Sequence, residues 1–167
     1  MGVSWFEAMA YAAWLDRRLR DEGKLPHGYV VRLATEAEWE KAARSGDARR
    51  HPWGDADWSE DRANIRDSGI GHVTPVGMYP NGATLSGTQD LAGNVWEWTL
   101  SRDRDYPYRP DDGRNDADGE GTRVLRGGSW DNIQRIARCA IRDGSGPDLF
   151  GDGIGFRVVV SLADSGF

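Results

Sequence analysis

The chain has 167 residues, of which 38% are apolar and 29% charged, a composition that excludes an intrinsically disordered protein. Its formal net charge of −6, with Lys24 and Lys41 as the only lysines, excludes an extended basic surface for nucleic acid. No apolar stretch is long enough to span a membrane and the start shows no signal-peptide pattern, so we predict a cytoplasmic protein without membrane contact.

Two capping boxes predict where two helices begin. Ser4 and Glu7 form the first box, and the helix behind it is expected to end near Arg20. Thr35 and Glu38 form the second box, which opens a helix that ends near residue 44. The apolar positions behind each box share one helical face: Ala8, Ala12, Leu15 and Leu19 in the first helix, and Trp39, Ala42 and Ala43 in the second.

From residue 45 onward the helical periodicity disappears, and Gly, Asp, Asn and Pro interrupt the chain. Residues 102–121 are polar and acidic and are expected to form an exposed loop. Short strands are predicted at 29–33, 73–78, 95–99, 122–126 and 155–160. The expected architecture is one α+β domain over residues 1–167, with two helices packed on short antiparallel strands and long loops that carry function.

Several short motifs occur in the order typical of the formylglycine-generating-enzyme (sulfatase-modifying-factor) family. They are Val-Ser-Trp at 3–5, Arg-Leu-Ala-Thr-Glu-Ala-Glu-Trp-Glu at 32–40, Pro-Trp-Gly at 52–54, Ala-Asn-Ile at 63–65, Thr-Pro-Val-Gly at 74–77, Asn-Val-Trp-Glu-Trp at 94–98 and Arg-Gly-Gly-Ser-Trp at 126–130. The chain resembles this family, which implies a C-type-lectin-like fold. Two features depart from the family pattern: Ala34 replaces a usual proline, and the chain starts at a normally interior helix, as a minimal version or a piece would.

In active members, the resemblance implies a copper-binding cysteine pair just after the Arg-Gly-Gly-Ser motif. Here Asn132 stands near the first cysteine's place, and residues 131–138 contain no thiol. Cys139 is the only cysteine, and we interpret it as a small core residue in a reducing compartment. The three histidines share no metal-ligand spacing, and no serine lies in a nucleophile-elbow motif. We therefore expect no catalytic residues and no copper, and we predict a non-enzymatic protein.

Oxygen ligands for calcium are a further implication of the resemblance. Two carboxylates and alternate backbone carbonyls suit a hard cation such as Ca²⁺. The first implied site uses the side chains of Asp90 and Glu97 with the carbonyls of Gly93 and Val95, and the second lies near Asn64, Ile65, Asp67 and Ile70. The alternative is that Asp90 and Glu97 cap turns or pair with arginines.

The C-terminal part of the chain resembles the variable proteins of diversity-generating retroelements, in which adenines of a template copy are randomised. Frame motifs of such proteins match residues 127–130, 135–142, 147–148 and 155–159. The segment 131–153 then holds the candidate ligand-binding positions: Asp131, Ile133, Ile136, Ile141, Asp143, Gly144, Ser145, Gly146, Leu149, Phe150, Gly151, Asp152 and Gly153. Their residue types are reachable from a randomised asparagine codon, whereas Gln134 is not and belongs to the frame.

Radical substitution is tolerated only where side chains project from a rigid scaffold. We therefore expect the apolar members of the segment, rimmed by Asp143 and Asp152, to form one exposed patch that binds an unknown protein. The alternative is a Gly-rich loop whose Ile and Phe side chains fill the core. The predicted function is that of a ligand-binding variable protein. The rival interpretations are an oxidase-like domain without its cysteine pair and a fixed sensory or interaction module of a larger regulatory protein.

Overall fold

The structure, a computed structural model of the chain, describes residues 1–163. The predicted domain over residues 1–167 thus includes four positions, 164–167, that lie outside the described residues. Within the described part, no helix is long and apolar enough to cross a membrane.

Both predicted helices form, and both begin at the expected capping boxes. Helix α1 (Trp5–Asp21) follows Ser4, whose hydroxyl accepts the Glu7 amide while the Glu7 carboxylate accepts the Ser4 amide at 2.8 Å. Helix α2 (Glu36–Arg44) starts behind Thr35 with the same reciprocal pair, formed with Glu38. Each box satisfies amides of the first helical turn that have no partner within the helix. Because its two residues lie three positions apart, each helix start can be predicted from the sequence.

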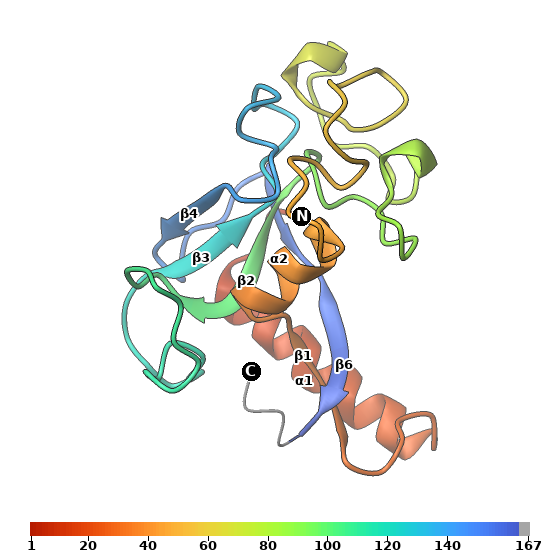
Figure 1. Cartoon of the computed structure of the whole chain (residues 1–167). Coiled ribbons are helices and arrows are strands. Elements are labelled where there is room, and N and C mark those ends of the chain that lie inside the picture. The colour runs from red at the N-terminus through yellow and green to blue at the C-terminus, as the bar shows by residue number, and fades with distance from the viewer. Residues whose placement is uncertain (164–167) are drawn as a thin grey trace.

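The first sheet has two antiparallel strands, β1 (Tyr29–Leu33) and β6 (Val158–Leu162), with Val31 opposite Val160. Helix α1 runs along this ribbon at one end of the molecule, as Figure 1 shows. The Asp16 carboxylate accepts the Val31 amide at 2.8 Å. A helix side chain therefore satisfies a donor on the outer edge of β1.

The second sheet has the order β4-β3-β2-β5. Its strands are β2 (Trp96–Arg102), β3 (Arg123–Arg126), β4 (Arg142–Ser145) and β5 (Ile154–Phe156). The β2–β5 pair is parallel and the other two pairs are antiparallel. Only Arg157 separates β5 from β6, so the chain passes from one sheet to the other at this residue.

Two strand predictions need correction, and one strand was not predicted. Residues 73–78 form no strand, because the Thr74 and Gly77 amides donate to the side chains of Asn94 and Asp90 instead of to a neighbouring strand. The predicted strand 155–160 is two strands in different sheets. Strand β4 was not predicted, because its residues, Arg-Asp-Gly-Ser, have low strand propensity and adopt the conformation by pairing with β3.

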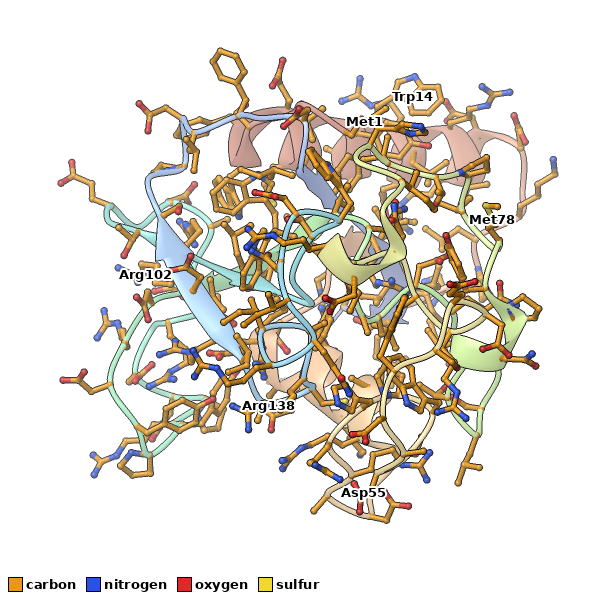
Figure 2. The ribbon with its side chains drawn as sticks, turned by 90° about the horizontal axis from the view of Figure 1, so that it is seen from above. Met1, Trp14, Asp55, Met78, Arg102 and Arg138 are labelled. Carbon is orange, nitrogen blue, oxygen red and sulfur yellow. The ribbon has the colours of Figure 1, made fainter. Side chains whose placement is uncertain are left out.

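The chain between α2 and β2 is irregular, with only two 3₁₀ turns, Arg66–Ser68 and Pro80–Gly82. It gathers at the end of the molecule away from α1 (Figure 1), and in Figure 2 Trp14 of α1 and Asp55 lie at opposite margins. This end has its own small core of Ala63, Ile65, Ala92 and Ala137, against which Trp53 and Trp58 pack. The larger clusters centre on Trp98 beneath α1 and on Trp39 of α2.

The predicted loop at 102–121 is exposed over most of its length but is anchored by buried arginines. Arg114 is 1% exposed and pairs with Asp112 at 2.8 Å. Arg123 donates to the carbonyls of Asp116, Ala117 and Gly119. The loop is therefore tied to the sheet through its backbone carbonyls.

Candidate functional site

Two glycines follow the end of β3 and turn the chain toward the candidate ligand-binding segment, residues 131–153. Gly127 and Gly128 have φ angles of +94° and +73°, a region that favours glycine. A Cβ on Gly127 would lie 3.2 Å from the Trp39 ring, and one on Gly128 would lie 3.4 Å from the Ala137 backbone. The pair therefore supplies both the left-handed backbone and the space for the following turn to pack directly against it.

Residues 131–139 form tight turns that hydrogen bonds attach to distant parts of the chain. The Arg66 amide donates to the Asn132 carbonyl at 2.9 Å, and the Cys139 amide donates to the Arg50 carbonyl at 2.8 Å. The Asn132 side chain accepts the Ser129 amide at 2.9 Å. These ties fix the backbone, so outward side chains can vary without moving it.

Cys139 is fully buried, with its Sγ 3.5 Å from the Ala43 carbonyl oxygen. Burial raises the pKa of its thiol to about 12, so the reactive thiolate does not form near neutral pH. The interpretation of Cys139 as a small core residue is confirmed.

The loop that follows β4 is anchored near both of its ends. The Trp5 amide donates to the Pro147 carbonyl at 2.9 Å, and the Trp96 amide donates to the Gly153 carbonyl at 2.8 Å. Between these anchors an open hollow of about 400 Å³ is lined by Ser145, Gly146, Asp148, Leu149 and Phe150. Four of these five residues are candidate ligand-binding positions.

Exposure distinguishes the candidate ligand-binding positions from part of the frame around them. None of the former is buried. Asp131, Ile133, Asp143, Leu149, Phe150 and Asp152 are exposed, and Ile136, Ile141, Gly144, Ser145, Gly146, Gly151 and Gly153 are intermediate. The frame is mixed: Gly127, Gly128, Ser129, Ala137 and Cys139 are buried, whereas Arg135, Ala140 and Asp148 are exposed.

The apolar candidate positions differ in their surroundings. Leu149 and Phe150, 45% and 70% exposed, share the hollow after β4. Ile133 is 41% exposed on the 131–139 turns, whereas Ile136 and Ile141 are half-buried. Ile133 and Phe150 therefore do not fill the core, and the gathering of all five side chains into one patch stays a prediction.

A network of buried charges supports the segment from the α2 side. Glu36 is 1% exposed and accepts from Arg142 Nε at 2.6 Å and Nη2 at 3.1 Å. Arg126 is fully buried, 3.7 Å from Glu36, and also binds Glu40. Sequence reasoning missed Glu36, because it stands inside a capping motif and its partner Arg142 is 106 residues away.

The first implied calcium set is brought together around an arginine. Asp90, Val95 and Glu97 line a hollow of about 200 Å³ together with Arg157. Arg157 binds Glu97 through Nε and Nη2, both at 2.5 Å, while the Asp90 carboxylate accepts the Gly77 amide. These contacts match the alternative in which Asp90 caps a turn and Glu97 pairs with an arginine. A calcium ion would compete with the guanidinium for Glu97.

Gly93, the fourth member of that set, has a packing role. Its amide donates to the Gly127 carbonyl at 2.9 Å, and a Cβ there would lie 2.2 Å from the Asn64 carbonyl oxygen. The glycine therefore allows the two loops to touch.

The second implied calcium set lies around the first 3₁₀ turn. Asn64 is buried, its amide nitrogen donates to the His72 carbonyl and its side-chain oxygen accepts from Ser68. Asn64 thus acts as a polar tie inside the loops. Of its predicted companions, Ile65 is buried, Asp67 exposed and Ile70 intermediate. Over residues 1–163, no group of three or more His, Cys, Asp or Glu side chains is arranged to hold a metal ion.

Comparison with known proteins places the chain among related sequences. A family profile described as the Sulfatase-modifying factor enzyme 1-like domain matches residues 1–162. Hercynine oxygenase of Mycolicibacterium thermoresistibile is 38% identical over 157 residues, which covers 87% of this chain and 32% of that protein. Formylglycine-generating enzyme of Streptomyces coelicolor is 38% identical over 175 residues, covering 93% of this chain and 50% of that protein. The chain thus spans about a third to a half of the length of these curated relatives.

Among solved structures, Treponema denticola variable protein 1 superposes with a TM-score of 0.77. The match covers 96% of this chain and 70% of that one at 23% sequence identity, so it shows the fold alone. The predicted α+β, C-type-lectin-like fold of the formylglycine-generating-enzyme type is confirmed.

The prediction of a non-enzymatic protein is wrong in the light of these relatives. Three proteins that are 38–39% identical over 87% of the chain are named hercynine oxygenase, which is an enzyme. The missing cysteine pair excludes only the chemistry that needs two thiolates, and an oxygenase can use other groups. The absence of the cysteine pair is therefore no evidence that the chain is non-enzymatic.

Proposed function

The chain belongs to the Sulfatase-modifying factor enzyme 1-like family, and we propose that it is a ligand-binding domain whose binding face is the variable segment 131–153 of a diversity-generating retroelement. The observation that carries this proposal is the exposure pattern: no candidate position is buried, whereas Ala137 and Cys139, which stand between candidate positions, are buried. A surface that changes in sequence without unfolding the protein needs this separation.

The chemistry of the face supports a protein as the ligand. Leu149 and Phe150 offer exposed apolar area, the kind of anchor that dominates protein interfaces. Asp143 and Asp152 are exposed acidic residues of the same segment. The net charge of −6 disfavours nucleic acid as the partner.

Sequencing the 3′ end of the gene across a population of the source cells tests the proposal. We expect substitutions at the first two bases of codons within 131–153, with the motifs at 135–142 and 155–159 constant outside the candidate positions. An adenine-rich near-copy of this stretch should lie beside the gene. A uniform segment with no such copy would contradict the diversification and leave a fixed binding face.

A second candidate function rests on the 38% identity to hercynine oxygenases. In this proposal the chain is the portion of an oxygenase whose 127–153 region faces the substrate. Titration of hercynine into the protein, followed by amide NMR, distinguishes the two. Saturable shifts confined to residues 127–153 support the oxygenase proposal, and unchanged spectra at millimolar hercynine contradict it.

A further inference from the structure

A second hollow lies outside the 131–153 segment, between α2 and the loop that follows β2. Its volume is about 390 Å³, within the range of about 300–1,000 Å³ that is usual for small-molecule sites. One wall is formed by α2, including Glu36, Glu40 and Lys41, and the other by Tyr106 and Tyr108. Neither the proposed binding face nor the calcium sets contribute to its lining.

The two tyrosine rings are held in place by buried or half-buried arginines. The Arg142 guanidinium lies 5.1 Å from the centre of the Tyr106 ring, and that of Arg114 lies 4.5 Å from the Tyr108 ring. The Tyr106 hydroxyl donates to Glu36 at 3.2 Å. Neither arginine lines the hollow, so the rings form a preorganised aromatic wall, which lowers the entropic cost of binding a flat ligand.

The charges around the hollow leave a surplus of cations. The carboxylates of Glu36 and Glu40 are already paired, the first with Arg142 and the second with Arg126. Lys41 has no ion pair within residues 1–163, although it is one of only two lysines in an acidic chain. Arg44 is the other cation of the lining; its Nε lies 3.4 Å from Glu40, and its side chain is 31% exposed.

We propose that this hollow binds a small aromatic carboxylate. The ring stacks on the wall of Tyr106 and Tyr108, and the carboxylate accepts charge-assisted hydrogen bonds from Lys41 and Arg44. An anion supplies an acceptor for the Lys41 ammonium, and a flat ring fills the apolar part of the hollow.

The test uses benzoate as the probe, with acetate as the charge without the ring and benzyl alcohol as the ring without the charge. Amide NMR of the intact chain should show saturable benzoate shifts confined to residues 36–48 and 106–108. Acetate and benzyl alcohol should bind at least about tenfold more weakly, because each keeps only one of the two interactions. Equal binding of either control compound, or no benzoate shifts in these residues at millimolar concentration, would overturn the proposal.

Two lysine variants give a matched comparison of the same charge change. Lys41→Gln should weaken benzoate binding at least about tenfold, which is the loss expected for one charge-assisted contact. Lys24→Gln, beyond the C-terminus of α1, should leave it unchanged. Equal affinities of the two variants would overturn the assignment of Lys41. The result is independent of the proposed function, because no residue of 131–153 takes part.

Discussion

The end of the molecule built from α1, β1 and β6 differs from the loop end, residues 45–95 with 127–153, in what holds the backbone. In the first, strand pairing and helical hydrogen bonds satisfy most backbone groups, as where β1 pairs along its whole length with β6. In the loop end, single backbone hydrogen bonds between distant turns and hydrogen bonds from side chains share that task. Asn94 alone accepts the Thr74 amide at 2.9 Å and donates to the Thr74 carbonyl at 3.2 Å. The loop end therefore depends on single residues, and the helical end on many weak contacts.

The largest expected effect comes from Arg157, which joins the two sheets. The substitution Arg157→Met leaves the Glu97 carboxylate, which is only 4% exposed, without its cation. Breaking a buried pair on one side costs about 3–5 kcal/mol in the free energy of unfolding. Urea denaturation measures this loss.

The control for Arg157→Met is Arg18→Met, which removes an exposed i,i+4 pair with Glu22 on α1. Such a pair contributes about 0.3–0.5 kcal/mol. Comparable losses in the two variants would show that the Arg157–Glu97 pair, which also ties the Gln89 and Asp90 carbonyls of the loop end, stabilises the fold no more than an exposed pair does.

The contact between loops at Gly93 should be the next most sensitive feature. Gly93→Ala places a Cβ 2.2 Å from the Asn64 carbonyl oxygen and adds strain at φ +72°. Because backbone must move, we expect a loss of about 3 kcal/mol or more in unfolding free energy. Gly69→Ala has nearly the same φ, +69°, with open space around it, and should cost only about 1 kcal/mol. Equal losses would mean that the loops separate easily.

Acid should weaken the loop end through His51. This ring is 2% exposed and stacks on Trp53 with centroids 4.7 Å apart, and its burial lowers the pKa of the imidazole. The unfolded chain binds a proton near the ordinary pKa of about 6.5 and the folded chain only at lower pH. The stability that neutral His51 contributes is therefore present above about pH 6.5 and is lost as the pH falls.

Urea midpoints between pH 7.5 and 5 measure that loss. We expect His51→Gln to show a flatter decline on acidification than the unmodified chain, since the other titrating groups are the same in both. His27→Gln, at an exposed position, should keep the original slope. A decline in His51→Gln as steep as in the unmodified chain would contradict the assignment.

Calcium binding should have a smaller effect on the stability of the loop end. If Asp90, Val95 and Glu97 take the ion in place of Arg157, calcium at five times its Kd adds about 1 kcal/mol of stability by mass action. Asp90→Asn should abolish the gain, and Asp67→Asn should leave it unchanged. Loss of the gain in Asp67→Asn would instead assign the ion to the second set. No change in the urea midpoint with calcium would leave Arg157 as the cation of this site.

The sequence predicts the helical end of the molecule better than the loop end. The helix starts are legible because Ser4 and Glu7, or Thr35 and Glu38, lie three residues apart. Glu36 and Arg142 meet only after folding, so no local pattern reveals them. Residues 73–78 have the composition of a strand but bind side chains of distant residues. Local signals therefore predict the helical end and the frame motifs, but not the buried charges that fix the loops.

The smallest expected effect is at the proposed binding face. Leu149→Ser and Phe150→Ser remove apolar side chains that are 45% and 70% exposed, so each should change the free energy of unfolding by no more than about 0.5 kcal/mol. Ala137→Leu, in the buried frame between candidate positions, should cost about 1–3 kcal/mol by overpacking. A loss above about 2 kcal/mol at Phe150 would place it in the core, and a segment that serves the core cannot be diversified. Tolerance at Phe150 beside intolerance at Ala137 is what lets one rigid loop end present many different surfaces.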